Sequence, residues 1–172
     1  MIFKIRVVLD IKEDVIRTIA IEGQKTLEEL HKTISAVFGF NGQQMASFYR
    51  ADNDWNQGEE IPLISMDDGP NALSMSTTTI AQNIEERNEK LIYVYDFLEM
   101  WTFFVELIEV SEEQVDALPK LVLSIGEVPE TAPEKEFKAE SAKNDPYGLD
   151  EFGDADGFGE FENLDDLDFD TY

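Results

Sequence analysis

Few side chains in this sequence are of the types that catalyse reactions or bind metal ions. The 172 residues include a single histidine, His31, and no cysteine. Disulfides, thiolate metal centres, thiol nucleophiles and sites built from several histidines are therefore excluded. The sequence also has no serine elbow, phosphate loop or paired-histidine motif. We expect no catalytic residue, no metal site and no cofactor.

One segment, the hairpin predicted over residues 93–101, has the composition of a small-molecule site. It places the carboxylate of Asp96 among aromatic side chains, and such a group must be hydrogen-bonded, exposed at the strand end or protonated. Each residue also has a structural alternative: Asp96 would cap the tight turn before Trp101, and His31 would stabilise the fold. The alternative function is therefore a small-molecule binder or an enzyme of unknown reaction, with His31, Asp96 and Trp101 as ligand-binding residues.

The end of the chain combines strong negative charge with aromatic rings. Residues 145–172 contain eleven Asp or Glu and no Lys or Arg, within a chain of net charge −25. A tail that only solubilises has no reason to keep aromatic rings in water. Such rings suit buried anchors, while the carboxylates steer the segment toward a basic surface. We expect a protein partner with a basic surface, or else self-association or folding back, through Phe152, Phe158, Phe161 and Phe169.

The overall charge limits the other partners. With 38 acidic against 13 basic residues, the surface repels phosphate backbones and anionic lipids, so we expect no direct binding to nucleic acid or membranes. No run of 18 uncharged apolar residues is present, which predicts a cytoplasmic protein without a signal peptide or membrane span. A second alternative function is mimicry of nucleic acid by the acidic arm.

Three regions are expected to organise these residues. Residues 1–126 show apolar alternation with few breakers and predict a folded domain. Residues 127–144, with Pro129, Pro133 and mixed charges, predict a linker. Residues 145–172 form the acidic aromatic arm, whose charge density opposes collapse of the arm alone.

Within the domain, apolar periodicity predicts strands and two helices. A capping box that starts at Thr26 begins a helix over 27–38, whose apolar stripe should lie across the sheet. A second, short helix is predicted over 111–118, while 65–83 is ambiguous. Strands are predicted over 2–10, 15–21, 46–50, 60–64, 91–97, 101–107 and 120–125, with 91–97 and 101–107 as a central hairpin.

Two segments of the domain resemble a known family. Residues 15–40, an extended segment followed by a helix with a Leu-His pair and then Phe-Gly-Phe, resemble the opening of the plasmid pRiA4b ORF-3-like family. Tyr93-Val-Tyr-Asp-Phe-Leu-Glu-Met-Trp101 is similar to that family's Tyr-x-Tyr-Asp-Phe-Gly-Asp-x-Trp signature. The resemblance covers residues 2–125.

The resemblance implies an α+β domain. Together with the elements predicted above, we expect a mixed, mainly antiparallel sheet, a long helix from the N-terminal half packed on it and a short second helix. It also implies a bacterial protein, often encoded on mobile elements, and no established activity. The sequence departs from the family at Thr102-Phe103, where Glu-His is usual, and near Ala46, where a second histidine is usual. We expect no site that depends on those histidines.

Overall fold

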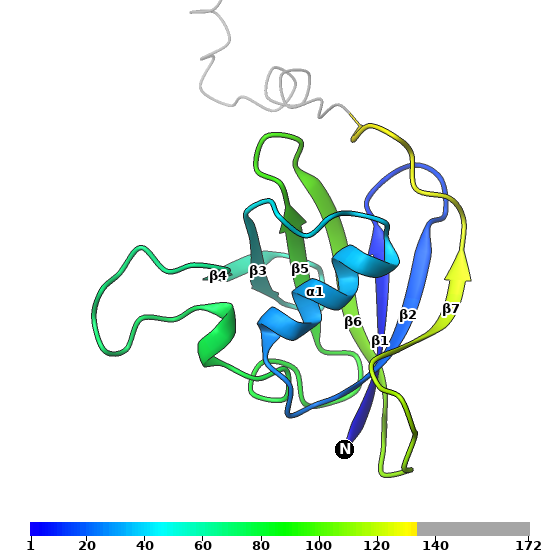
Figure 1. Ribbon diagram of the computed structural model, residues 1–172, viewed down its shortest axis with the longest axis horizontal. Helices are drawn as coiled ribbons and strands as arrows, with labels where there is room; N and C mark the ends of the chain where they lie inside the picture. Colours follow the sequence, from blue (N-terminus) through cyan, green and yellow to red (C-terminus); the bar gives the residue numbers. More distant parts are fainter. Residues whose placement is uncertain (134–172) are drawn as a thin grey trace, which may run out of the picture. The chain divides into compact units, whose positions relative to one another are not determined.

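Seven antiparallel strands form one sheet in the computed structural model of the chain, which describes residues 1–133. Their order across the sheet is β4-β3-β5-β6-β1-β2-β7, so β6 lies in the middle and β4 and β7 are the two edges (Figure 1). Each neighbouring pair runs antiparallel. The strands are β1 (Ile2–Leu9), β2 (Ile16–Glu22), β3 (Ala46–Ala51), β4 (Gln57–Pro62), β5 (Lys90–Tyr95), β6 (Trp101–Ser111) and β7 (Lys120–Ile125).

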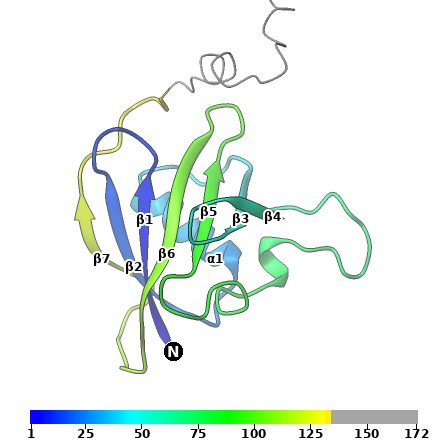
Figure 2. The same cartoon turned by 180° about the vertical axis from the view of Figure 1, so that it is seen from behind.

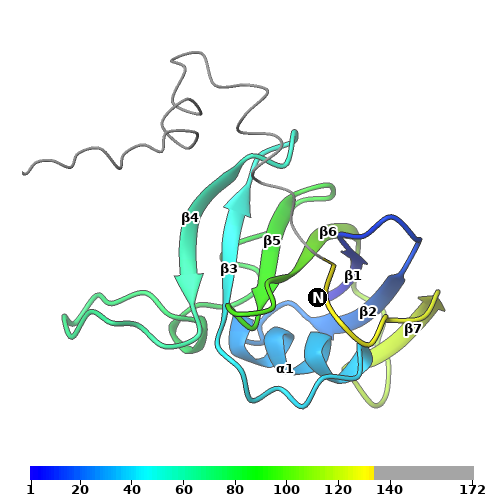
Figure 3. The same cartoon turned by 90° about the horizontal axis from the view of Figure 1, so that it is seen from above.

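One short helix, α1 (Leu27–Val37), covers one face of the sheet. Thr26 is its N-cap, because the Thr26 hydroxyl accepts a hydrogen bond of 3.2 Å from the backbone N–H of Glu29. Leu30 and Ile34 lie one turn apart on the apolar stripe of the helix and are fully buried. Figure 3 shows α1 on one side of the strands, and Figure 2 shows the sheet from its other face, with α1 behind it.

The side chains on the α1 side of the strands form the core. Because side chains alternate between the two faces of a strand, cross-strand partners on this face stack into layers. Val7 lies opposite Val105, and Tyr93 lies opposite Phe103. All four side chains are fully buried, and burial of one such side chain contributes about 1.5–3 kcal/mol to folding. The strand alternation in the sequence is thus explained by a single core beneath one helix.

The predicted fold class, α+β with a long helix and a short second helix, is wrong, because the protein is mostly β. α1 has eleven residues, and the other helical element within residues 1–133 is one 3-10 turn, η1 (Met75–Thr77). No helix forms over 111–118. Instead β6 continues to Ser111, whose hydroxyl accepts a hydrogen bond of 3.0 Å from the N–H of Glu113. The turn uses the N–H of Glu113, which could equally donate to the N-cap of a helix. A helix as short as 111–118 is also only marginally stable by itself.

Arg17 on β2 connects the end of α1 to the edge strand β7. Its Nε donates a hydrogen bond of 3.2 Å to the carbonyl of Val37, in the last turn of α1. Its Nη1 and Nη2 donate to the carbonyls of Ile125 and Gly126 at 2.8 and 3.2 Å. The last turn of α1 contains no basic residue, so Arg17 also supplies the positive charge that the negative end of the helix dipole favours.

Replacing Arg17 should therefore loosen β7 more than the rest of the sheet. Arg17→Met leaves the carbonyls of Val37, Ile125 and Gly126 without this donor, and we expect a loss of about 1–3 kcal/mol in unfolding free energy. We also expect faster amide hydrogen exchange in β7 than in β1, measured by mass spectrometry.

The matched control is Arg6→Met, which removes an ion pair with Glu106 in which the Arg6 side chain is 44% exposed. Glu106 keeps Lys90 as its second partner, so the loss should be at most about 1 kcal/mol. Equal losses for the two variants, or unchanged exchange in β7, would contradict the role of Arg17.

Candidate functional site

His31, one of the three predicted ligand-binding residues, lies inside the protein. Its Nδ1 atom shares a hydrogen bond of 2.6 Å with the hydroxyl of Tyr93 on β5. His31 is 2% exposed and Tyr93 is fully buried. Burial lowers the pKa of the His31 imidazole below its ordinary value and raises the pKa of the Tyr93 hydroxyl well above its own. Both groups are therefore neutral at pH 7, and their hydrogen bond connects α1 to the sheet.

Trp101 belongs to an aromatic cluster beside His31. Phe40 stacks on Tyr95 with 4.8 Å between ring centroids, and its ring lies 5.0 Å from Trp101. Tyr95 in turn lies 6.3 Å from His31, so the structure brings His31 and Trp101 into one cluster with two rings between them. Tyr95 and Trp101 are both buried. The cluster packs the segment that follows α1 onto β5 and β6.

Asp96, the third predicted residue, lies in the turn between β5 and β6. Its φ of 65° falls in the left-handed region, which Asp tolerates better than most residues. Its Oδ1 atom accepts hydrogen bonds of 3.1 and 3.3 Å from the N–H groups of Leu98 and Glu99. The carboxylate therefore caps the turn before Trp101, which is one of the two roles that the sequence left open. A ligand-binding role for His31, Asp96 and Trp101 stays a prediction.

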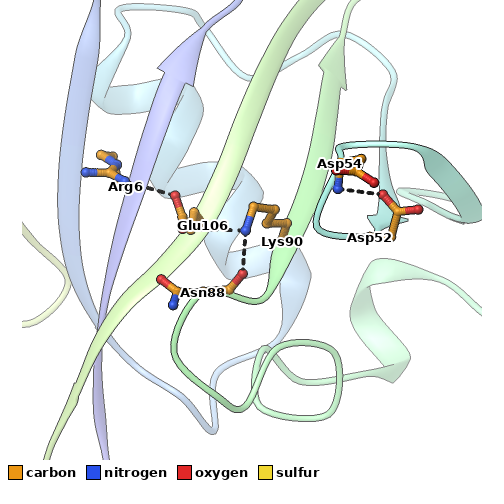
Figure 4. Close-up of polar contacts among 6 residues, drawn as sticks. All are labelled: Arg6, Asp52, Asp54, Asn88, Lys90 and Glu106. Atoms are coloured by element: carbon orange, nitrogen blue, oxygen red, sulfur yellow. Dashed lines mark hydrogen bonds and ion pairs between the residues drawn. The ribbon is translucent and has the colours of Figure 1, made fainter.

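The sheet face opposite α1 carries an ion cluster around Glu106 on β6, shown in Figure 4. Arg6 Nη2 donates to Glu106 Oε1 at 2.9 Å, and Lys90 Nζ lies 3.6 Å from Glu106 Oε2. Lys90 also donates to the carbonyl of Asn88 at 2.8 Å and lies 5.4 Å from the centroid of the Trp55 ring. The Lys90 and Glu106 side chains are 12% and 16% exposed. These charges compensate one another and connect β1, β6 and β5.

The two edge strands of the sheet differ sharply in composition. β4 reads Gln-Gly-Glu-Glu-Ile-Pro, and its one large aliphatic side chain, Ile61, is fully buried. β7 reads Lys-Leu-Val-Leu-Ser-Ile, and all six residues are exposed. Charged residues and proline protect an edge from pairing with other chains, and β7 has only Lys120 in this role. The apolar side chains of β7 are 41–47% exposed, and they are Leu121, Val122, Leu123 and Ile125.

Carboxylates lie near the start of β7. A hollow of about 280 Å³ is lined by Glu22, Glu112 and Glu113 together with Leu118, two residues before the strand begins. The charge at the other end is mixed, because the guanidinium of Arg17 donates to the last carbonyl of the strand and Glu127 is exposed. The chain as a whole carries a net charge of −25. Its field therefore favours a polypeptide with positive charge as the partner of this exposed apolar strand.

The sequence predicted a strand over 120–125 but did not identify it as an exposed edge. Its apolar run is the pattern of a buried strand, and a signal for exposure exists only in the sheet order. The buried Arg17 had a signal, since the other core-facing residues of its strand, Ile19 and Ile21, are apolar. The predicted partner-binding residues Phe152, Phe158, Phe161 and Phe169 lie outside residues 1–133, as do most of the predicted linker and the whole arm.

A seven-stranded antiparallel sheet under one short helix is a fold shared with a solved structure. A protein of unknown function from Methanosarcina mazei Go1 superposes with a TM-score of 0.60 at 19% identity, covering 75% of this chain and 72% of that one. The sequence of residues 1–134 matches the family described as plasmid pRiA4b ORF-3-like protein, and the chain belongs to that family. The comparison with curated proteins found no match.

The family membership confirms the resemblance seen in the sequence, and it assigns no activity. One further finding concerns the helices. α1, with eleven residues, is too short to cross a membrane, and no other helix within residues 1–133 is long and apolar enough to do so.

The buried His31 should make stability depend on pH. Its pKa is lowered in the folded protein, so the unfolded chain binds this proton more readily. The stabilisation is complete above the ordinary histidine pKa of about 6.5 and is lost as the pH falls from there toward the folded pKa, with a slope of up to about 1.4 kcal/mol per pH unit. Urea unfolding at pH 7.5, 6.5 and 5.5 measures this loss.

The control variant is His31→Phe, which removes the titrating group and should flatten the pH profile in this window. Tyr93→Phe instead leaves Nδ1 of His31 without its partner and should cost about 1–3 kcal/mol at pH 7.5. A pH profile that is the same in wild type and His31→Phe would show that another group is responsible.

Proposed function

We propose that the protein is a non-enzymatic protein-interaction protein of the cytoplasm, which binds a partner with a basic surface through its acidic aromatic arm. The observation that carries this proposal is the composition of residues 145–172, in which aromatic and leucine side chains are interspersed with eleven acids and no base. Aromatic residues are typical anchors at protein interfaces, and surrounding charges increase the rate of association. Phe152, Phe158, Phe161 and Phe169 are the proposed anchors.

The folded domain supports the proposal by how it uses its reactive side chains. His31 is hydrogen-bonded to Tyr93, and the carboxylate of Asp96 accepts hydrogen bonds from the backbone of its turn. Arg6 and Lys90, two cations on the sheet face opposite α1, form ion pairs with Glu106. These contacts give each group a structural role, which favours binding by surfaces over chemistry at a pocket. The domain then serves to present the arm and a second exposed surface, β7.

The rival function, a small-molecule binder or enzyme centred on the 93–101 hairpin, has a specific requirement. His31 and Trp101 are 2% and 6% exposed, so a ligand would reach them only after Phe40 and the segment following α1 moved away. A ligand that bound there would raise the melting temperature, and Asp96→Ala would abolish the rise. The acidic mimic of nucleic acid predicts instead that DNA competes for the same partner.

The proposed function is tested with the full chain as bait in a cell extract. Replacing the four arm phenylalanines by serine keeps the length and the net charge but removes the anchors. Since each anchor ring contributes about 2 kcal/mol or more, we expect partners retained by the wild type to be lost. Quantitative mass spectrometry of the retained proteins is the measurement.

The matched control neutralises four arm acids, with Asp154, Asp156, Asp165 and Asp166 changed to asparagine. It keeps every ring, so we expect the same partners to be retained with slower association and weaker salt dependence. Identical retention by the wild type and the serine variant would remove the arm from the function.

A further inference from the structure

We propose that β7 is a second binding surface, one that accepts an extended polypeptide segment with alternating apolar and basic residues as an eighth strand of the sheet. The inference goes beyond the proposed function, because it places binding on the folded domain and not on the arm. It stands on the exposure of β7, on the contrast with β4 and on the charge around the strand.

The first step is that β7 has a free edge. β7 pairs with β2 on one side, and it is the last strand of the sheet formed by residues 1–133. An edge strand presents unpaired N–H and C=O groups in a row, which is a template for another strand. The opposite edge, β4, is protected by Glu59, Glu60 and Pro62. On β7 the protection is limited to Lys120 and one bulge.

The second step is that apolar side chains of β7 are exposed on the sheet face opposite α1. Leu123 pairs with Thr18 and Ile125 pairs with Ile16, two residues of β2 that point away from the core. Leu123 and Ile125 each leave more than 40% of their surface exposed. Because side chains alternate between the two faces of a strand, an added strand with apolar residues at every second position would cover both. The segment that fits therefore has apolar residues next to Leu123 and Ile125, and its other residues point to the opposite face.

The third step is the charge of the segment. Glu22, Glu112 and Glu113 lie by the start of β7, and the chain carries a net charge of −25. A second copy of the chain carries the same net charge, so long-range repulsion opposes the pairing of two β7 strands. The acidic arm, with eleven acids and no base, would be repelled in the same way. A segment with Lys or Arg beside its apolar residues would instead be attracted.

The fourth step identifies a position at which the free edge can be blocked. The register of β7 on β2 shifts, with Leu123 opposite Thr18 and Leu121 opposite Ile19, so Val122 is the extra residue of a bulge. Val122 has no partner residue on β2. Proline on an edge strand hinders pairing with an added strand, and at this position it replaces no residue of a β2–β7 pair, whereas threonine keeps the N–H and the branched side chain.

The experiment uses the full chain and a synthetic nine-residue peptide that alternates lysine and valine. Two control peptides have the same charge: in one, glycine replaces each valine, and in the other every backbone amide is N-methylated and cannot donate. Isothermal titration calorimetry at 50 mM and 300 mM NaCl measures the affinities. We expect the lysine–valine peptide to bind at least about tenfold more tightly than either control, with weaker binding at the higher salt.

The variants then assign the binding to β7. Val122→Pro should abolish the preference for the lysine–valine peptide, and Val122→Thr should retain it, with circular dichroism showing that both are folded. Equal binding of the three peptides would overturn the proposal, since charge alone would explain it. Unchanged preference in Val122→Pro would also overturn it. The N-methylated peptide requires no variant, so the proposal is falsifiable even when Val122→Pro does not fold.

The other occupants give different results. A second copy would appear as a dimer by sedimentation, strengthened by salt and lost in Val122→Pro, and that result would overturn the proposal. Coverage by the arm would appear as peptide binding only after the four arm phenylalanines are replaced by serine, and it would overturn the proposal as well. Loss of partners from the serine variant with unchanged peptide binding would support both surfaces independently.

Discussion

The buried guanidinium of Arg17 is the constraint on which the arrangement of the helix and the edge strand depends. A buried charge without hydrogen bonds is very costly, so a place in the core requires fixed acceptors around it. Those acceptors are the carbonyls of Val37 at the end of α1 and of Ile125 and Gly126 at the end of β7. The ring of Phe38 lies beneath the guanidinium, 5.2 Å away. One side chain on β2 therefore fixes both elements, and β7 is held in place without being buried.

Much of the fold could be predicted because it is encoded locally. The N-cap of α1 is made by Thr26 and the N–H of Glu29, three residues apart, and the hairpins of β1 with β2 and of β5 with β6 join neighbouring segments. The prediction of a helix over 111–118 was wrong because a serine such as Ser111 caps a turn as readily as a helix. Because this helix is absent and α1 is short, the fold is mostly β and not α+β. The sheet order, which joins β1 to β6 and β2 to β7, depends on pairings far apart in the sequence.

The candidate sites were harder to predict, because they too depend on contacts between residues far apart in the sequence. His31 and Tyr93 are 62 residues apart, and nothing near His31 in the sequence indicates a buried partner. The apolar run of β7 is typical of a buried strand, and only its position at the end of the sheet order makes it exposed. The proposal for the arm rests on sequence composition alone, because the structure describes residues 1–133. The two surfaces follow one another along the chain, and both suit partners with positive charge.

The most direct test of this account is residue-resolved amide hydrogen exchange in β7 of the isolated full chain at pH 7. The account predicts that β7 amides directed away from β2 exchange quickly while those paired with β2 are protected, and that the lysine–valine peptide protects the first group. The same amides already protected in the isolated monomer would contradict the central claim, since the edge would then be occupied by the protein itself.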